Sequence, residues 1–463
     1  MEQRKHLSKG IQKFAFLNYA IVSLSVFCLF FTACVSDNGV SSSDKKTLQN
    51  TSREFQYNYR LLYYYYVDQD KYLGEPQDYV DKVDMQKMYE KEIPWDYYDL
   101  YYMYAMMNDN FTYYVDASRA YSLLNSLRQS DELTGAGFRL DSLAFPDKFI
   151  IQKVTKNSPA DRAGLKAGDE IVEIEGVAPT NETVFRRLAV ASKGETITYT
   201  IKRDSTRITI PVVIDSYLSP TVELSFYDSI PVIKISEFVA NTSNDSGTYG
   251  EFVQYLRETE KYKATIIDLR DNGGGDGDQC KAMTRALLSK GDTAIGIIET
   301  KADTIRKRQA FDTTFEINTA DGIAKDRYFV FLSNNNTASC SELMIAGVVS
   351  NKKYPIVGSV SYGKGIGQTR WITPSFSIAS ITSMKVIDKD RNSYHKYGIE
   401  PDFSIQDNDL ILATAAELAK EMKFKRIAGY GKTNTGHFAK QAVAQDTMPG
   451  FYLLPEEYRK KFE

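Results

Sequence analysis

The spacing of hydrophobic positions changes along the 463-residue chain, and each change predicts a different kind of structure. From 51 to 130 the sequence is rich in tyrosine. Several tyrosines recur at the i, i+3, i+4 and i+7 spacing of one helix face, namely Tyr97, Tyr98, Tyr101, Tyr102 and Tyr104. We predict a small helical domain here. Its tyrosines could bind a sugar or a peptide, but such a stripe more often packs one helix against another, with the hydroxyl groups at the rim.

Between 131 and 216 short stretches alternate between apolar and polar residues. This alternation predicts strands over 149–154, 170–174, 196–201 and 206–214. Two short helices are expected among them. The first has Ser158 as its cap, Pro159 in its first turn and Gly164 at its end, and the second spans about 181–191. We therefore predict a β-rich domain.

From 217 to 422 apolar runs of strand length alternate with helical stretches. Buried strands are predicted over 232–235, 264–269, 328–332 and 356–359. Helices near 279–288 and 341–350 directly follow two of them, and this alternation favours an α/β core. The final stretch, 423–463, has no clear pattern of hydrophobic positions, so the sequence does not indicate its role.

The first fifty residues have the pattern of an export signal followed by a linker. Basic residues precede an apolar run from about 14 to 31, and small residues lead into Cys34. Thr32-Ala33-Cys34 resembles a bacterial lipobox, in which the cysteine is lipidated and becomes the mature N-terminus. A plain signal anchor is the alternative. We expect 1–33 to be a signal peptide and 34–50 a polar tether, with the protein lipid-anchored in the bacterial cell envelope, facing the periplasm or the outer surface.

The composition of the chain reduces the number of possible partners and kinds of active site. The 57 lysines and arginines are balanced by 60 acidic residues, so no basic excess points to a nucleic-acid partner. Four cysteines are too few for a disulfide framework in a chain of this length. Three histidines leave little room for a histidine-rich metal site or a Ser-His-Asp triad. We expect no metal ion and no cofactor.

A candidate nucleophile lies where a predicted strand ends and a helix begins. The segment 335–342 reads Asn-Asn-Thr-Ala-Ser-Cys-Ser-Glu. A hydroxyl at such a turn lies beside the free N–H groups of a helix N-terminus, which favour developing negative charge. From these residues alone, a helix cap at Ser339 or Ser341 is a commoner explanation than a nucleophile.

A serine nucleophile needs a base, and the chain offers two kinds. His395 lies in a polar, loop-like segment, and His437 lies near the C-terminus. Lys364 stands between Gly363 and Gly365, where close backbone packing can bury an ammonium group and favour its neutral form. A solvent-exposed loop lysine is the alternative.

The sequence around Gly135, Ala136, Gly137 and Phe138 resembles the Gly-Leu-Gly-Phe loop of PDZ domains. The segment 158–176, Ser-Pro-Ala-Asp-Arg-Ala-Gly-Leu-Lys-Ala-Gly-Asp-Glu-Ile-Val-Glu-Ile-Glu-Gly, continues the resemblance. It implies a PDZ domain over 131–216, whose loop N–H groups bind the C-terminal carboxylate of a peptide. A PDZ domain that only packs against its neighbour is the alternative.

Two further motifs resemble the tail-specific, carboxy-terminal processing serine peptidases. Thr-Ala-Ser-Cys-Ser-Glu ends at Glu342, and Ser-Tyr-Gly-Lys-Gly-Ile-Gly-Gln ends at Gln368. In that family the middle serine of the first motif is the nucleophile, a lysine 25 positions later is the base, and a glutamine four positions further supports the lysine. The resemblance assigns these roles to Ser339, Lys364 and Gln368, and it implies a crotonase-like α/β core over 217–422.

A third segment, Asp-Leu-Arg-Asp-Asn-Gly-Gly-Gly at 268–275, resembles the family's Asp-Leu-Arg-x-Asn-x-Gly-Gly. Glycines at the end of a strand expose backbone N–H groups that can stabilise an oxyanion. The resemblance implies an oxyanion hole formed by Gly274 or Gly275 and by the backbone N–H of Cys340. Similar segments at 108–114 and 397–402 extend the resemblance over about 105–420.

The sequence thus predicts a multidomain α+β protein with a helical N-terminal domain, a β-rich PDZ domain and an α/β peptidase core. The expected activity is that of a serine endopeptidase acting on proteins or peptides, with the PDZ domain reading their C-termini. Two alternatives stay open. One is a non-catalytic, peptide-binding lipoprotein of the same fold, and the other is a cysteine peptidase that uses Cys340.

Overall fold

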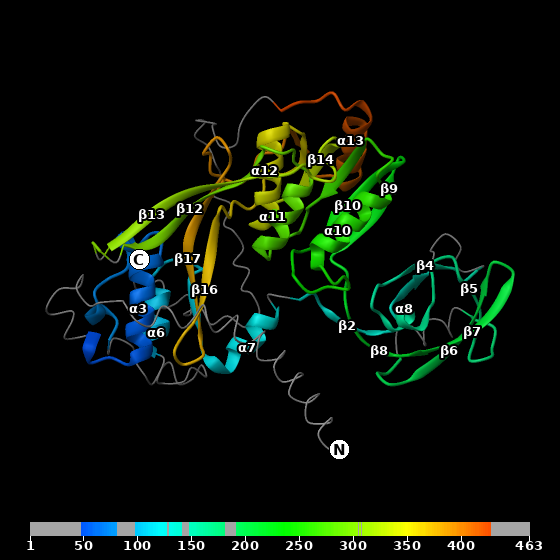
Figure 1. Cartoon of the computed structure of the whole chain (residues 1–463), viewed down its shortest axis with the longest axis horizontal. Helices are drawn as coiled ribbons and strands as arrows, with labels where there is room; N and C mark the ends of the chain where they lie inside the picture. The colour runs from blue at the N-terminus through cyan, green and yellow to red at the C-terminus, as the bar shows by residue number, and fades with distance from the viewer. Residues whose placement is uncertain are drawn as a thin grey trace, which may run out of the picture.

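The computed structural model describes residues 48–80, 98–126, 129–140, 148–180, 191–303, 305–306 and 308–426. The predicted signal peptide, Cys34, nearly all of the tether, the second PDZ helix and most of the C-terminal stretch lie outside these residues. Figure 1 shows a helical N-terminal region, a central α/β core and a β-rich lobe on the far side of the core. None of the helices within the described ranges is both long and apolar enough to cross a membrane.

The N-terminal region is helical, as predicted. Its elements are α3 (Arg53–Tyr65), α4 (Gln69–Tyr72), the 3-10 helix η1 (Pro76–Asp78), α6 (Tyr98–Ala105), β1 (Tyr113–Val115) and α7 (Ala117–Ser126). Many of its tyrosines are buried between helices, so the packing interpretation is confirmed. Their hydroxyls are not all at the rim, however, because the Tyr66 hydroxyl donates to the Met107 carbonyl at 2.8 Å and that of Tyr104 donates to Asn58. The tyrosines therefore serve both the apolar core and a buried polar network.

The β-rich lobe follows the predicted pattern closely. Its elements are β2 (Glu132–Gly135), β3 (Phe138–Leu140), β4 (Ile151–Val154), α8 (Pro159–Ala163), β5 (Glu170–Ile174), β6 (Thr196–Arg203), β7 (Thr206–Val213) and β8 (Asp215–Leu218). The Ser158 hydroxyl caps α8 by accepting the Asp161 N–H, and Gly164 ends the helix at φ 89°. The antiparallel pair β2–β8 joins the lobe to the core (Figure 1).

A six-stranded sheet forms the centre of the core, in the order β18-β15-β14-β11-β10-β9. The strands are β9 (Val222–Tyr227), β10 (Ile230–Ile235), β11 (Ala264–Asp268), β14 (Tyr328–Ser333), β15 (Ile356–Gly358) and β18 (Phe403–Ser404). Only the β9–β10 pair among them is antiparallel. Successive residues of β14 face opposite sides: Phe329 and Phe331 join one apolar cluster, while Val330 joins the other.

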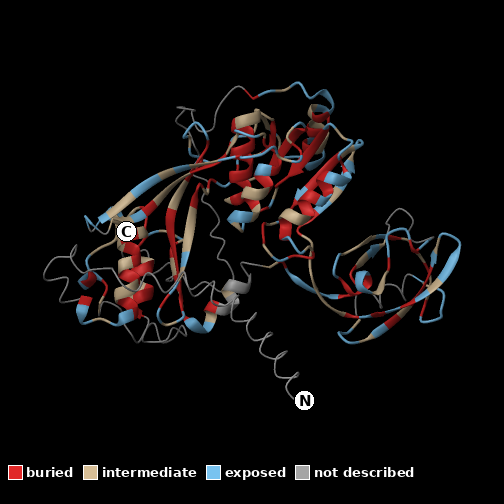
Figure 2. Cartoon of the chain, viewed as in Figure 1, coloured by how far each residue is buried: buried red, intermediate tan, exposed pale blue. Residues whose placement is uncertain are grey.

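Helices cover both faces of this sheet. The helices are α10 (Gly247–Glu258), α11 (Gly277–Ala286), α12 (Cys340–Lys352) and α13 (Asn408–Glu421). The first three contribute side chains to one apolar cluster, and α13 packs on the opposite face through Ile411, Ala415 and Ala419. Buried residues are concentrated in this layered core, whereas the outer strands expose one side (Figure 2). The predicted α/β core is confirmed.

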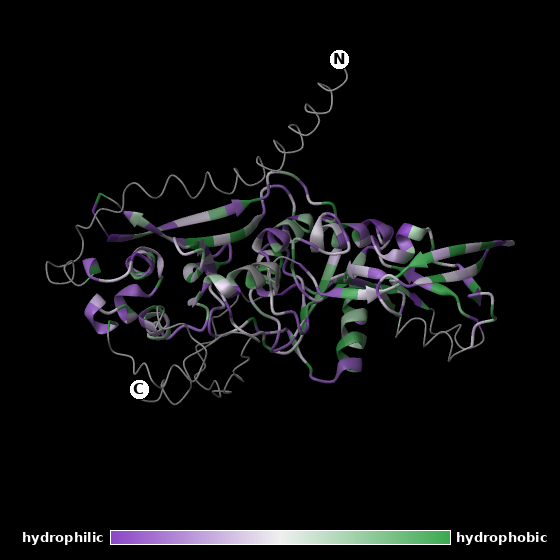
Figure 3. Ribbon diagram, turned by 90° about the horizontal axis from the view of Figure 1, so that it is seen from below, coloured by the Kyte–Doolittle hydropathy of each residue, from purple (hydrophilic) through white to green (hydrophobic). Residues whose placement is uncertain are grey.

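A second sheet links the core to the N-terminal region, and the sequence did not predict it. It consists of β12 (Thr293–Asp303), β13 (Arg308–Ile317), β16 (Ile366–Ile372), β17 (Ile378–Ile387) and the N-terminal strand β1. β1 pairs with the first residues of β17, and Ala379 and Ile381 of β17 enter the N-terminal apolar cluster. β17 is buried over most of its length, whereas β13 has no fully buried residue. Hydrophilic and hydrophobic residues are interspersed along the strands of the molecule (Figure 3). The N-terminal region is therefore built into the core, and the β-rich lobe lies between them in sequence.

Candidate active site

Ser339 lies in the turn between β14 and α12, as the sequence predicted. Its backbone has φ 55° and ψ −113°, a conformation that residues with side chains rarely adopt. The turn is fixed to the end of β11, because the Ala338 N–H and the Ser341 hydroxyl both donate to the Asn272 carbonyl, at 2.9 and 3.0 Å. Ser339 occupies the N-cap position of α12, so the same residue can be both the helix cap and a candidate nucleophile.

Glu342 connects the serine turn to the lysine loop, a role the sequence analysis did not recognise. One carboxylate oxygen, Oε2, accepts the Ser339 N–H at 2.9 Å and the Lys364 N–H at 2.7 Å. The two backbone nitrogens therefore lie within 5.6 Å of each other, the sum of these distances. The other oxygen accepts the Ser361 hydroxyl at 2.5 Å and the Gly363 N–H at 2.6 Å. Burial raises the pKa of Glu342, and these four bonds oppose that rise.

The Lys364 loop is packed as closely as its glycines suggested. A side chain at Gly363 would come within 2.8 Å of the Gly398 nitrogen, and one at Gly365 within 2.9 Å of the His395 nitrogen. The Lys364 ammonium makes no hydrogen bond or ion pair with any described residue, and its Nζ lies 4.0 Å from the centre of the Phe111 ring. Burial, helped by the nearby Arg370, lowers the pKa of Lys364 to about 8. Lys364 is half-buried, which disfavours the alternative of a solvent-exposed loop lysine.

Gln368 lies near the start of β16. Its side-chain amide donates to the Thr382 hydroxyl at 3.2 Å, and within the described ranges it makes no hydrogen bond to Lys364. The supporting role assigned to it by resemblance stays a prediction. The structure places it on the strand that follows the lysine loop.

The glycine-rich loop after β11 lies directly against Ser339. A Cβ atom on Gly274 would come within 2.7 Å of the Ser339 Cβ and 3.0 Å of the Cys340 nitrogen. The Gly274 N–H itself donates to the Asn272 side-chain oxygen at 2.9 Å. The N–H groups of Gly275 and Cys340 donate no hydrogen bond within the described part of the chain. Of the two glycines named from the sequence, Gly275 is therefore the better oxyanion donor.

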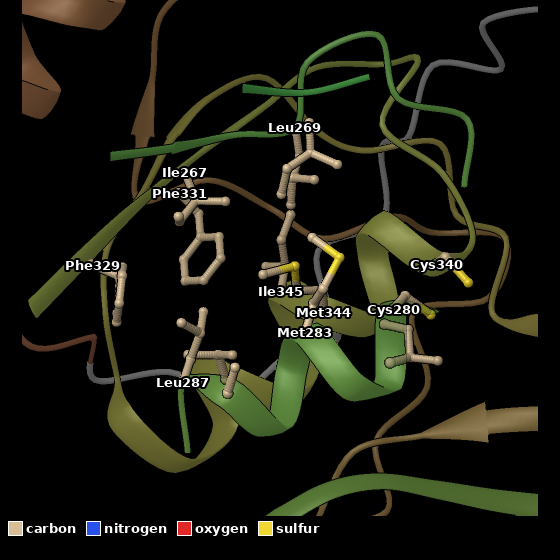
Figure 4. Close-up of a cluster of buried hydrophobic side chains, with 14 of the residues drawn as sticks. Ile267, Leu269, Cys280, Met283, Leu287, Phe329, Phe331, Cys340, Met344 and Ile345 are labelled. Atoms are coloured by element: carbon tan, nitrogen blue, oxygen red, sulfur yellow. The ribbon is translucent and has the colours of Figure 1, made fainter. Parts of the chain in front are cut away.

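The Cys340 side chain belongs to the buried apolar cluster of the core. Figure 4 shows it beside Cys280 of α11 in the buried cluster. Only 6% of Cys340 is exposed, and its thiol donates to the Gly275 carbonyl at 3.5 Å. Burial, and then the neighbouring Cys340, raises the pKa of Cys280. A nucleophilic role for Cys340 is disfavoured, because an attacking sulfur must reach substrate.

His395 lies closer to the site than its polar segment suggested. It packs against Gly365, and its Nδ1 is buried with no partner among the described residues. Burial and then Lys396 lower the pKa of His395. His437 lies outside the described residues. Within the described ranges there is no group of three or more histidine, cysteine or acidic side chains suited to a metal ion.

The predicted PDZ loop turns its carbonyls inward. The Ala136 carbonyl accepts the Ala160 N–H at 2.7 Å, and the Gly137 carbonyl accepts from Thr155 and from the Ser158 hydroxyl. The N–H groups of Ala136 and Gly137 donate no hydrogen bond between described residues. The Phe138 ring packs edge-on against Tyr199 in the domain core. The loop thus has unused donors, as carboxylate binding requires.

This site brings together a serine in a strained strand-to-helix turn, a lysine with a lowered pKa and backbone N–H groups without partners among the described residues, an arrangement that suits serine-type hydrolysis. Residues 229–405 match the family model Peptidase family S41, and residues 125–214 match the PDZ domain model. The chain is a serine-type peptidase with a PDZ domain, and it is similar to the C-terminal processing peptidases.

Similar proteins carry matching names. The chain is 28% identical to the carboxy-terminal processing protease CtpB of Bacillus subtilis, over 75% of this chain and 68% of that protein. It is 29% identical to a CtpA-like serine protease of Staphylococcus haemolyticus, over 56% of this chain and 50% of that protein. The chain thus spans about half the length of the staphylococcal relative. A solved structure of the photosystem II D1 C-terminal processing protease has 20% identity and a TM-score of 0.44, covering 81% of this chain and 97% of that one.

Proposed function

We propose that this chain is a lipid-anchored serine endopeptidase of the cell envelope, with Ser339 as nucleophile and Lys364 as general base. The observation that carries the catalytic part is the single Glu342 oxygen that binds the backbone of both residues. It fixes the nucleophile turn relative to the base loop without bonding either reacting side chain. Preorganisation of this kind lowers the cost of bringing reacting groups together.

The proposed reaction begins with a neutral Lys364. At a pKa of about 8, roughly a tenth of the lysine is neutral at pH 7 and half at pH 8. The neutral amine accepts the Ser339 hydroxyl proton as the oxygen attacks the scissile carbonyl, and the ammonium then donates a proton to the leaving amine. The N–H groups of Gly275 and Cys340 stabilise the oxyanion, and water hydrolyses the acyl-enzyme in the second half of the cycle.

The test is proteolysis of unfolded proteins with varied C-termini, followed by mass spectrometry of the products. Wild type should cut, whereas Ser339→Ala and Lys364→Ala should each lose at least about a thousandfold in rate. Both variants should keep the wild-type circular dichroism spectrum. Cleavage by Ser339→Ala at the wild-type rate would leave Ser339 as a helix cap, and no cleavage by wild type would favour the non-catalytic binding protein.

We propose further that the PDZ loop binds the substrate's C-terminal carboxylate. Gly137 has φ 84°, and a Cβ there would come within 2.2 Å of the Ser158 Cβ, whereas a Cβ on Gly135 would meet nothing within 4 Å. Gly137→Val should therefore reduce cleavage of substrates with a free C-terminus, and Gly135→Ala serves as the matched control. Amidation of the substrate should mimic Gly137→Val. Equal cleavage of amidated and free-acid substrates by wild type would make the PDZ domain a packing module.

The anchor is the third part of the proposal, and it is supported by the sequence around Cys34. Cys34→Ser should abolish incorporation of a labelled fatty acid and release the protein from membranes. Unchanged labelling of this variant would contradict the lipoprotein assignment.

A further inference from the structure

We propose that Phe111, contributed by the N-terminal region, is a positioning residue for the base: its ring face binds the Lys364 ammonium and holds it away from Ser339 between turnovers. The proposal rests on the function proposed for Lys364. The N-terminal region thereby becomes part of the active site, although Phe111 and Lys364 are 253 positions apart in the sequence.

The geometry is that of a cation–π contact. The Lys364 Nζ lies 4.0 Å from the centre of the Phe111 ring, well inside the range of about 6 Å over which a ring face attracts an ammonium group. No hydrogen bond or ion pair to a described residue competes for that ammonium. Once Lys364 loses its proton, the attraction to the ring is lost, and the neutral amine is free to turn toward the serine.

Phe111 is held firmly in place. Asp109 accepts the Phe111 N–H at 2.9 Å and the Thr112 hydroxyl at 2.7 Å. The Thr112 hydroxyl oxygen accepts the Thr382 N–H at 2.9 Å, and the Thr382 hydroxyl in turn accepts the Gln368 amide. The turn that carries the ring is therefore tied to the strands that follow the lysine loop, which keeps the Phe111 backbone in place beside the lysine.

Other charges around the lysine do not account for its resting position. Burial and Arg370 favour the neutral amine, while Asp109, Glu342 and Cys340 favour the ammonium through the local field. None of these groups forms an ion pair with Lys364. Among the described residues, the ring face is the one contact at the ammonium itself that stabilises the charged form.

Lys364 ionisation can be measured without relying on catalysis. The Ser339→Ala variant is treated with an amine-reactive anhydride over a range of pH, and modification of Lys364 is followed by mass spectrometry, because only the neutral amine reacts. Phe111→Leu in this background should move the labelling midpoint down by about 0.4 to 1.5 pH units, the range expected for loss of a cation–π contact. The control Phe376→Leu, at a ring that is 78% exposed, should not move it.

The same shift should appear in catalysis. With Ser339 restored, the acid limb of kcat/KM for Phe111→Leu should move down together with the labelling midpoint, and Phe111→Tyr should restore both. Fluorinated phenylalanines at 111 keep the ring shape but weaken its negative face, so the midpoint should fall stepwise even if leucine disturbs folding. An unchanged midpoint in the fluorinated series would overturn the proposal and leave Phe111 as an apolar wall. Absence of peptidase activity in wild type would instead overturn the proposed function. The two failures can be told apart, because the labelling experiment does not depend on peptidase activity.

Discussion

Gly274 offers the sharpest steric test of the site, because its hydrogen atom faces the nucleophile. In Gly274→Ala the new methyl carbon would lie 2.7 Å from the Ser339 Cβ, whereas ordinary contacts begin at 3.4 Å. The two must separate by at least 0.7 Å, the difference between these distances. The backbone at Gly274 also has φ 107°, which costs a residue with a side chain of order 1–3 kcal/mol. Alanine therefore strains the loop and displaces the serine.

The expected effect on catalysis is large. A displacement approaching 1 Å costs about a hundredfold in rate, and loss of one oxyanion donor costs about a hundred- to a thousandfold. The methyl group also approaches the Cys340 nitrogen to 3.0 Å, where the oxyanion would receive a hydrogen bond. We expect kcat to fall at least about a hundredfold, equivalent to about 2.7 kcal/mol of transition-state stabilisation.

The neighbouring glycine provides a matched control. A Cβ on Gly273 would meet nothing within 4 Å, and Gly273 does not have a positive φ. Steady-state cleavage of a short peptide, with kcat and KM measured separately, should show Gly273→Ala within about threefold of wild type. Thermal melts of both variants distinguish loss of activity from loss of fold. A Gly274→Ala enzyme with wild-type kcat would refute the placement of this loop against the serine.

Three further predictions address the other parts of the site. Peptidase activity should rise with pH through about 8 and level off above it, because the proposed base is neutral Lys364 and its pKa lies near 8. A pH–rate limb near 6.5 that disappears in His395→Ala would make His395 the base instead. Glu342→Gln should lower the free energy of unfolding by about 2–4 kcal/mol in urea titrations and should also reduce kcat. The reason is that an amide has one oxygen where the carboxylate uses two to accept four donors. An unchanged free energy of unfolding would show that the carboxylate is not needed. Cys340→Ala should keep activity within a few-fold in the same peptide assay, because its thiol is buried; loss of activity comparable to that of Ser339→Ala would support the cysteine peptidase.

Helices, strands and turns that depend on neighbouring residues were predicted well from the sequence. The helix at 159–163 was recognised from its serine cap, its proline and its terminal glycine, each of which acts through neighbouring backbone groups. The buried strands of the central sheet stood out as short apolar runs bounded by turns. Ser339 and Lys364 were placed on the correct turn and loop through motifs whose residues lie close together in sequence.

Long-range contacts could not be predicted in this way. β13 has few buried positions, and β12 pairs with β17, a strand made about 80 residues later, so the pairing leaves no local pattern in the sequence. The Phe111 ring meets Lys364 only because β1 pairs with β17. Glu342 was visible as part of a motif, but its four donors come from two loops that only the fold brings together.

The pairing of β1 with β17 also constrains when the protein can complete its fold during translation. The residues around Lys364, the proposed base, come from a turn before the PDZ domain and from loops and strands that are made later in translation. A partly synthesised chain can fold its PDZ domain, whose strands are contiguous in sequence, but it cannot yet hold the base in place. Proteolytic capacity is therefore acquired late, after the strand at 378–387 has returned to meet the N-terminal region.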